Sequence, residues 1–305
     1  MLAAIPYFEI GVFTLDIPGV QMDLPIDPWT TLVCLGFVLG LEMARHRGIK
    51  LGLDVRDVVD SAVFVVVSGF VVAHWFTLFL YKPHLLTEKG WTIILRFWEV
   101  GFSSFGGFLG AVLGMALFFK VIRPRPFWRF ADVVMYGFPF GWVLGRLGCA
   151  SVHDHVGSLT TFPLAMDFDH GARLMQTPEG IRWLTAGDPA IENGIRHELG
   201  LYEASYMLIL CAVFLALGRR DRVPGMFAGL FAVLYAPVRF GLDFLRNTDL
   251  SYQDARYFGL TPAQYGCIAM LGLGIWLLGT RDWKGFRPWP MDGRADQGQA
   301  PPAEA

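Results

Sequence analysis

Residues 61–81 read SAVFVVVSGFVVAHWFTLFLY, a stretch of 21 residues without a single Lys, Arg, Asp or Glu. A helix needs roughly 20 apolar residues to cross the hydrocarbon core of a bilayer, which is about 30 Å thick. A buried helix of a soluble protein would be shorter and interrupted by polar residues. The stretch therefore predicts a membrane-spanning helix.

The rest of the chain has a similar composition. Of the 305 residues, 54% are hydrophobic and only 17% are charged, whereas a soluble domain carries about 25% charged residues. We therefore predict an all-α, polytopic membrane protein with seven transmembrane helices. The predicted spans lie at roughly 29–45, 59–81, 100–122, 132–149, 201–218, 225–245 and 263–280.

The segments around these spans give the predicted organisation. A proline-rich arm (1–28) is expected to lie at the outer interface as strand or loop. Transmembrane helices one to four (29–149) are followed by a polar insert (150–200), which we expect to form a small periplasmic cap together with the arm. Helices five to seven (201–280) precede a tail (281–305) that is expected to be cytoplasmic and disordered.

The basic residues predict the orientation. Fifteen of the 25 Lys and Arg residues fall in loops on one side of the predicted membrane, and nine fall in the longer segments on the other side. Because basic residues collect in cytoplasmic loops, the N-terminus is expected outside and the C-terminus inside. No Lys or Arg precedes Arg45, so we expect no cleavable signal peptide. The net charge of −2 disfavours a nucleic-acid partner.

Charged residues inside membrane spans are costly and are therefore functional candidates. In the predicted sixth span Tyr235, Arg239, Asp243 and Arg246 share one helical face by their i, i+4, i+8, i+11 spacing. A structural ion pair of Arg239 with Asp243 is the simpler explanation, but it leaves one arginine in excess. A guanidinium binds phosphate or carboxylate oxygens through two parallel hydrogen bonds. The face therefore predicts an anion-binding site.

A second candidate is the segment GRLGCASVHDHVG (145–157), where the predicted fourth span ends on the outer side. Gly145 and Gly148 flank Arg146 and would let the backbone approach a ligand closely. The structural alternative is an arginine that extends to the lipid headgroups.

Two histidines follow in the same segment. If it continued as a strand, His153 and His155 would face the same side and could hold a metal ion. The sequence offers no clear third ligand, so we predict no metal site. A hydrogen-bonded acid–base pair with Asp154, or plain interfacial polarity, is the favoured interpretation.

Two further segments precede and follow this candidate. The run GFSSFGGFLGAVLG (101–114) places glycines every four residues, which is typical of close packing between membrane helices. In RHELGLYEASY (196–206), Tyr202 is a common type of interfacial anchor. Glu203 beside it is expected to pair with an arginine of another span, because a buried carboxylate needs a partner.

Three motifs together resemble one family. GRLG (145–148), HELGLYEA (197–204) and APVRFGLDFLR (236–246), in this order, are similar to bacterial prolipoprotein diacylglyceryl transferases. The opening IPYFEIGVFTLDIPG, the GFSSFGGFLG run, Asp132 and LTPAQ (260–264) match the layout of that family, so the resemblance covers nearly the whole chain.

The resemblance implies a multi-pass enzyme of the bacterial inner membrane. It would transfer a diacylglyceryl group from phosphatidylglycerol to the lipobox cysteine thiol of a preprolipoprotein, and glycerol phosphate would leave. The lipid would enter sideways from the membrane, and no metal or soluble cofactor is expected. A paralogue with another acceptor or lipid, an anion or lipid transporter, and a non-enzymatic lipid-binding protein are the alternatives.

This chemistry assigns the expected roles. Arg146 and Arg239 would hold the phosphate, and His155 or His153 would accept the thiol proton with Asp154 as the orienting group. The expected substrate-binding residues are Arg246, Tyr235, Tyr202, Glu203, Asp243, Gly145, Gly148, Gly106 and Gly107.

The chain departs from the family pattern at three positions. Phe105 stands where the family usually has His, Cys149 where it usually has Asn, and Asp154 where it usually has Glu. The loss of a candidate base at position 105 and the gain of two imidazoles near Asp154 suggest that the proton acceptor has been relocated.

Overall fold

The structure, a computed structural model, describes residues 4–8, 10, 13–16, 23–97, 99–168, 173–177, 180–184, 194–250, 254–281, 283 and 285–286. The predicted disordered tail falls almost entirely outside these residues. The chain forms two compact units, each described below by itself. The first comprises Met1–Gly40, Pro139–Ala212 and Gly241–Gln253, and the second comprises Leu41–Phe138, Val213–Phe240 and Asp254–Ala305.

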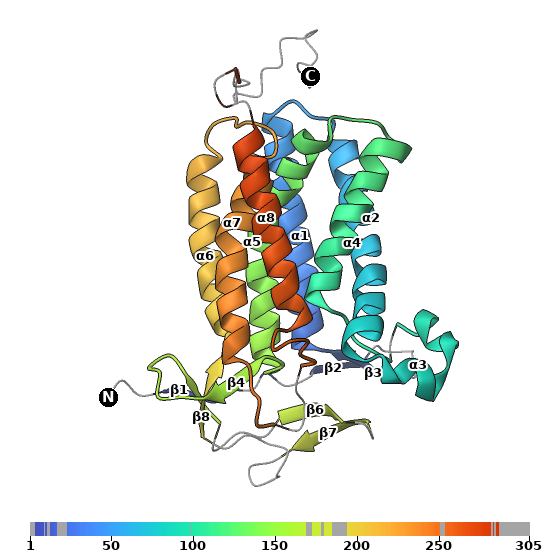
Figure 1. The fold of residues 1–305 in the computed structure, drawn as a ribbon, viewed down its shortest axis with the longest axis vertical. Coiled ribbons are helices and arrows are strands. Elements are labelled where there is room, and N and C mark those ends of the chain that lie inside the picture. Colours follow the sequence, from blue (N-terminus) through green and yellow to red (C-terminus); the bar gives the residue numbers. More distant parts are fainter. Residues whose placement is uncertain are drawn as a thin grey trace. The chain divides into compact units, whose positions relative to one another are not determined.

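Most of the chain is helical (Figure 1). The helices are α1 (Pro28–Lys50), α2 (Val55–Phe76, extended by a π-helix to Tyr81), α3 (His84–Lys89), a 3₁₀ helix (Trp91–Leu95), α4 (Ser104–Leu117, extended by a π-helix to Ile122), α5 (Phe127–Ser151), α6 (Leu199–Leu217), α7 (Met226–Leu242, extended by a 3₁₀ turn to Leu245) and α8 (Pro262–Thr280).

Six of the described helices are long and apolar enough to cross a membrane, and together they make a multi-pass membrane protein. They are α2, α4, α5, α6, α7 and α8, counted with their extensions. The sequence predicts seven spans. The predicted first span, which is α1 in the structure, is not apolar enough to be counted among the six. Its last three turns carry Glu42, Arg45, Arg47 and Lys50, which lower its hydropathy although it is 23 residues long.

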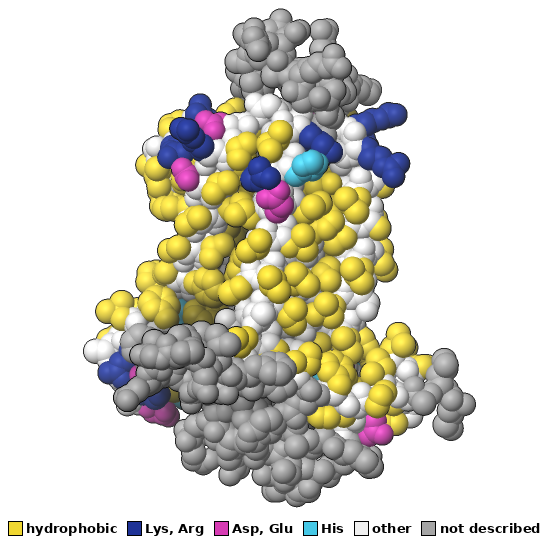
Figure 2. All heavy atoms as spheres, turned by 180° about the vertical axis from the view of Figure 1, so that it is seen from behind, with side chains coloured by type: hydrophobic (Ala, Val, Ile, Leu, Met, Phe, Trp, Pro, Cys, Tyr) yellow, Lys and Arg dark blue, Asp and Glu magenta, His cyan; other side chains and the backbone are white. Residues whose placement is uncertain are grey.

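The outward side chains of these helices are hydrophobic, as Figure 2 shows for one face of the molecule. Val63 and Val67 of α2 are 59% and 58% exposed, and Val112 and Leu113 of α4 are both 53% exposed. Side chains of this kind would be buried in a water-soluble protein. Their exposure along whole helices is what contact with lipid requires.

The first unit contains a small four-stranded sheet in the order β1–β5–β8–β4. Its strands are β1 (Ile5–Pro6), β5 (Met166–Asp167), β8 (Ile195–Glu198) and β4 (Val156–Leu159). Two hairpins, β2 (Phe13–Asp16) with β3 (Asp23–Ile26) and β6 (Arg173–Thr177) with β7 (Gly180–Leu184), lie outside this sheet. The fold is thus not purely α-helical, because the N-terminal arm and the polar insert form strands. The sheet joins the end of α5 to the start of α6, since β4 follows α5 and β8 leads directly into α6.

The second unit holds a buried arginine in the last turn of α1. Arg47 is 3% exposed, and its guanidinium lies 4.6 Å from the ring centroid of Tyr136 and 4.5 Å from that of Phe227. Its Nη1 donates a hydrogen bond to the carbonyl of Gly218 at 3.0 Å. The flat cation is stabilised by the two aromatic faces.

Helices α2 and α4 run side by side in the second unit (Figure 1). A Cβ atom on Gly106 would lie 2.4 Å from Cβ of Phe76, and one on Gly110 would lie 2.5 Å from the Ser68 carbonyl oxygen. Next to Gly107 the nearest atom would be 4.0 Å away. The four-residue glycine repeat therefore serves helix packing, which is also the structural explanation for the predicted substrate-binding residue Gly106.

The Gly110→Ala substitution is expected to destabilise the protein by about 1–3 kcal/mol, because its methyl group must push two helix backbones apart. Gly272→Ala in α8 is the matched control, since a Cβ there meets nothing within 4 Å. Thermal unfolding in detergent should give a lower midpoint for Gly110→Ala only. Equal midpoints for both variants would mean that α2 and α4 are not tightly packed.

Candidate active site

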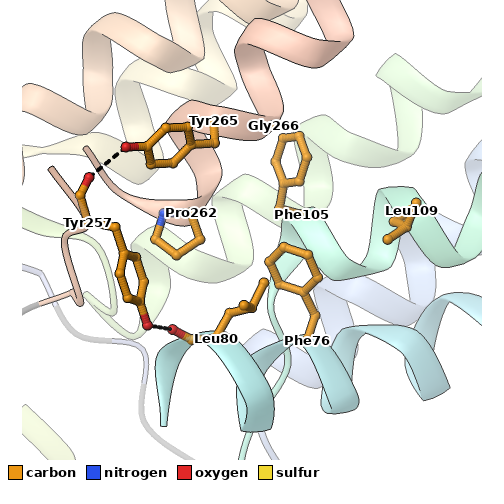
Figure 3. Close-up of a pocket in the computed structure, with 8 residues that line it drawn as sticks. All are labelled: Phe76, Leu80, Phe105, Leu109, Tyr257, Pro262, Tyr265 and Gly266. Carbon is orange, nitrogen blue, oxygen red and sulfur yellow. Dashed lines mark hydrogen bonds between the residues drawn. The ribbon is translucent and has the colours of Figure 1, made fainter. Parts of the chain in front are cut away.

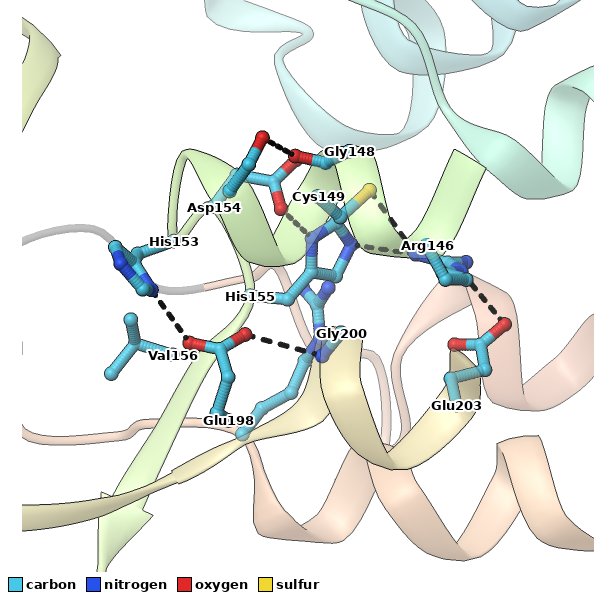
Figure 4. Close-up of polar contacts among 12 residues, drawn as sticks. Arg146, Gly148, Cys149, His153, Asp154, His155, Val156, Glu198, Gly200 and Glu203 are labelled. Carbon is cyan, nitrogen blue, oxygen red and sulfur yellow. Dashed lines mark hydrogen bonds and ion pairs between the residues drawn. The ribbon is translucent and has the colours of Figure 1, made fainter. Parts of the chain in front are cut away.

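Arg146 is the centre of the polar cluster in the first unit (Figure 4). It lies in the last two turns of α5 and is only 2% exposed. Its Nε lies 2.8 Å from Oε1 of Glu203 on α6, and its guanidinium lies 4.8 Å from the ring centroid of Trp142. Trp142 Nε1 donates to the same Glu203 oxygen at 2.9 Å. The predicted pairing of Glu203 with an arginine of another helix is thus confirmed, and the pair fixes the guanidinium in place.

The other edge of the guanidinium faces a thiol and an imidazole. Arg146 Nη1 lies 3.7 Å from Sγ of Cys149 and 3.3 Å from Nε2 of His155. On the far side of the ring, His155 Nδ1 is in close contact with Oδ1 of Asp154. Because a guanidinium can only donate, Nε2 accepts and Nδ1 carries the proton that it donates to Asp154. Arg146, His155 and Asp154 therefore form one hydrogen-bonded chain.

The protonation states follow from these neighbours. Burial lowers the pKa of His155 below its ordinary value, and the charges of Arg246 and Arg146 act in the same direction against that of Asp154. Partial burial alone would raise the pKa of Asp154, but the contact with His155 and the charges of Arg146 and Arg246 outweigh it and lower that pKa. At neutral pH the imidazole is therefore neutral and the carboxylate is ionised.

His153 does not share this environment, and residues 153–155 do not form the strand that a metal site of the two histidines would require. The segment is a turn before β4, and His153 has a positive φ of 49°. Its side chain is directed to Glu198, with Nδ1 at 3.1 Å from Oε2, and its Nε2 donates to the Phe8 carbonyl at 2.7 Å. Burial raises the pKa of Glu198 despite the contact with His153. These contacts favour a structural role for His153.

The His153→Asn substitution is expected to lower the free energy of unfolding by about 1–3 kcal/mol, because Glu198 and the Phe8 carbonyl each lose a partner. Asparagine tolerates the positive φ, so the backbone turn should persist. Thermal unfolding should show the lower midpoint, while the rate of the reaction per folded molecule should stay near that of the wild type. A large loss of rate without loss of stability would return His153 to the catalytic residues.

Other predicted site residues of the first unit lie around this cluster. Arg246 Nε lies 3.3 Å from Oδ1 of the buried Asp243, and Arg246 forms a backbone bridge to Gly157 in β4. Asp243 thus pairs with Arg246. The charge of Arg246 is one of those that lower the pKa of His155. Tyr202 lies elsewhere on α6, where its hydroxyl is 3.1 Å from Nδ1 of His197.

The two predicted glycines beside Arg146 differ from each other. A Cβ on Gly145 would meet nothing within 4 Å, so space is open at this glycine. A Cβ on Gly148 would lie 3.3 Å from the Trp29 carbonyl oxygen in α1, so this glycine serves helix packing.

Arg239 and Tyr235 belong to the second unit, where both lie on α7. They are 6% and 1% exposed, and the Tyr235 ring stacks on Phe231 with centroids 4.9 Å apart. An arginine that is buried in an apolar helix keeps its place among the functional candidates.

An apolar cavity of about 390 Å³ lies in the same unit among α2, α4 and α8 (Figure 3). Phe105 forms part of its wall and fits against Gly266, where a Cβ atom would lie 1.7 Å from the ring. Tyr257 and Tyr265 line it as well, with their hydroxyls donating to the carbonyls of Leu80 and Tyr257 at 2.7 Å. Phe105 therefore belongs to a hydrophobic wall, and no proton transfer is expected there.

Sequence reasoning missed two contributors to the site. Trp142 carries no signal in the sequence that marks it as functional, although it lies one helical turn before Arg146 and contacts it. Cys149 stands out in the sequence only as a departure from the family pattern, yet its sulfur lies beside Arg146. The spacing Cys149-x₄-Asp154-His155 was visible in the sequence, but only the turn after α5 brings these residues together.

Comparison with known proteins agrees with the motifs. The family described as prolipoprotein diacylglyceryl transferase matches residues 19–280. Phosphatidylglycerol–prolipoprotein diacylglyceryl transferase of Nitratidesulfovibrio vulgaris (strain Miyazaki F) is 30% identical over 258 residues, which cover 82% of this chain and 88% of that protein. The proteins of the same name from Haemophilus influenzae (strain PittEE) and Symbiobacterium thermophilum are 29% and 30% identical; the matches cover 90% and 81% of this chain, and 93% and 83% of those proteins.

Proposed function

The chain belongs to the prolipoprotein diacylglyceryl transferase family, and we propose that it transfers a diacylglyceryl group from phosphatidylglycerol to the lipobox cysteine thiol of preprolipoproteins. In this reaction the thiol sulfur attacks a glycerol carbon and forms a thioether. The bond from that carbon to the phosphate oxygen breaks, and glycerol phosphate leaves with the electron pair.

The observation that carries the proposal is the buried Arg146, held by Glu203 at 2.8 Å with open space beside Gly145. Negative charge grows on the phosphate oxygen as the bond breaks. A fixed guanidinium therefore stabilises the transition state more than the ground state, and it needs no reorganisation during the reaction. Arg246 supplies a second positive charge in this unit, and Arg239 on α7 retains its predicted role as a phosphate ligand.

The acceptor thiol must lose its proton before or during the attack, because the thiolate is the nucleophile. Asp154 and His155 are the groups we assign to this activation. They adjoin Arg146 through His155 Nε2, so thiol and phosphate would meet in one place. His155 replaces the function that a histidine at position 105 would serve in the usual family pattern.

We further propose that α1 is the seventh span and that the sheet of the first unit faces the periplasm. At 23 residues α1 is about 34 Å long, enough to cross the hydrocarbon core. Its Glu42 and Arg45 neutralise each other, with Arg45 Nε at 2.7 Å from Oε2 of Glu42. The excess of basic residues in the opposite loops supports a cytoplasmic C-terminus for a protein of the inner membrane.

A cellular test is to express the chain in a bacterium whose own diacylglyceryl transferase is depleted. Mass spectrometry of a reporter lipoprotein should detect a thioether-linked diacylglyceryl group with wild type and with the Cys34→Ser control, but not with Arg146→Ala. Cys34 is exposed on α1 and lies outside the site. A stably inserted wild-type protein that leaves the reporter unmodified would contradict the proposed function.

A further inference from the structure

Three potential metal ligands lie close together beside Arg146 (Figure 4). They are the sulfur of Cys149 in the last turn of α5, and the carboxylate of Asp154 and a ring nitrogen of His155 in the turn before β4. One ligand atom from each residue lies within 4.8 Å of the other two. Their burial is graded, since Cys149 is buried, His155 is partly buried and Asp154 is exposed, so the cluster is open on one side.

The chemistry of the three groups matches one class of ion. Thiolate, carboxylate and imidazole are the three side-chain ligands that Zn²⁺ takes in proteins, with bonds of about 2.0–2.3 Å. Donors around a tetrahedral ion are then roughly 3.3–3.8 Å apart. Small side-chain movements would therefore suffice to gather the three donors around one ion. A thiolate and a carboxylate also neutralise a divalent charge.

The positive charge of the neighbouring Arg146 does not prevent a cation from binding here. The charge of Arg146 is balanced by Glu203 at 2.8 Å. An N–H group of Arg146 faces the Cys149 sulfur at 3.7 Å, within reach of a weak hydrogen bond to it. The ligand atom of His155 would be Nδ1, which now contacts Oδ1 of Asp154. An ion bound to both atoms would replace the proton that His155 and Asp154 share.

We propose that Cys149, Asp154 and His155 form a binding site for a thiophilic divalent cation, Zn²⁺, whose fourth position takes the thiol of the acceptor peptide. This inference rests on the proposed function for the identity of the thiol, but the binding of the ion does not depend on it. Three protein ligands and one open position are the arrangement of catalytic rather than structural zinc.

The ion explains how Asp154 and His155 activate the acceptor. A thiol that coordinates Zn²⁺ is deprotonated, and its proton passes to solvent water. The sulfur electron pair then forms the bond to the glycerol carbon, while the carbon–oxygen bond breaks and its electron pair stays on the phosphate oxygen. Neither the ion nor the substrates change oxidation state.

Loading of the ion also has a consequence for Arg146. With Nδ1 bound to the ion, the neutral imidazole carries its proton on Nε2. Two N–H groups cannot donate to each other, so the guanidinium no longer donates to His155. The Nη1 group of Arg146 then becomes available to the phosphate of the lipid, while Glu203 continues to hold Nε.

The first test measures the metal alone. The full-length protein, purified in detergent with a trace of Zn²⁺, should contain about one zinc per chain by plasma mass spectrometry. Exchange with Co²⁺ should produce a near-ultraviolet thiolate-to-cobalt band, and a lipobox peptide should alter that band. The Cys149→Ser, Asp154→Asn and His155→Gln variants should bind about 10–100-fold more weakly. The Cys34→Ser control should bind like wild type, because Cys34 is exposed on α1 and is not one of the three ligands.

The outcomes separate this inference from the proposed function. A folded wild-type protein without stoichiometric zinc and without a cobalt–thiolate band overturns the site, and so does a Cys149→Ser variant that retains the band. Protein that still transfers diacylglyceryl groups after complete removal of metal overturns the role of the ion in activating the thiol but leaves the proposed function intact. A cobalt–thiolate band in a protein that transfers no diacylglyceryl group supports the site and contradicts the proposed function.

Discussion

Replacing Arg146 with lysine is expected to lower kcat/KM for diacylglyceryl transfer by about 100–1000-fold, the loss typical of one preorganised donor to a developing negative charge. Lysine keeps the charge but not the planar fork that can bind Glu203 and a phosphate at the same time. The buried carboxylate of Glu203 would also compete for the single ammonium group. The defect should fall mainly on kcat, because the charge on the leaving phosphate appears in the transition state.

The matched control is Arg47→Lys. Arg47 is 3% exposed and Arg146 is 2% exposed, so both substitutions disturb a buried guanidinium next to an aromatic ring. Arg47→Lys should lower the unfolding midpoint and leave kcat/KM of the folded fraction near the wild-type value. An Arg146→Lys variant that keeps full activity would remove Arg146 from the mechanism, whatever its effect on stability.

The His155→Ala substitution is expected to cost at least about 100-fold in kcat, because the acceptor thiol loses the group that promotes its ionisation. The loss should be similar whether His155 acts as a proton acceptor or as a ligand of an ion, so the rate tests the residue and the metal content tests its mode of action. The measurement is the initial rate of thioether formation on a lipobox peptide at saturating lipid.

The neighbouring histidine is the control for this prediction. His153→Asn should reduce stability and preserve the rate, because both ring nitrogens of His153 are used by Glu198 and the Phe8 carbonyl. If His155→Ala kept full activity and His153→Asn were stable but inactive, His153 would be the catalytic histidine and His155 the structural one. Unimpaired transfer with both substitutions would show that neither imidazole takes part.

The helices could be predicted because their signal is local. A run such as residues 61–81 contains its own evidence for spanning a membrane, and α2 covers most of it. The strands could not be predicted in the same way, since β1 and β5 contribute only two residues each, and paired residues such as Ile5 and Met166 are 161 positions apart in the sequence. Their formation depends on long-range pairing rather than on any pattern within them.

The same distinction holds for the site. Glu203 was expected to meet an arginine because a carboxylate among apolar helices needs a counter-charge, and the structure pairs it with Arg146. The separation of His153 from His155 could not be foreseen, because it depends on a turn with positive φ at His153. The approach of Cys149 to Asp154 depends on the same turn.

The central claim is that this chain moves a diacylglyceryl group to a thiol with phosphate as the leaving group. The most direct test uses phosphatidylglycerol labelled separately in the acyl chains and in the headgroup, with a lipobox peptide as acceptor and with Arg239→Ala beside wild type. We expect wild type to place both acyl chains on the peptide thiol and to release the headgroup label as water-soluble glycerol phosphate, and Arg239→Ala to do neither. Folded wild-type protein that leaves the peptide unlabelled, or that transfers the headgroup label with the acyl chains, would contradict the account.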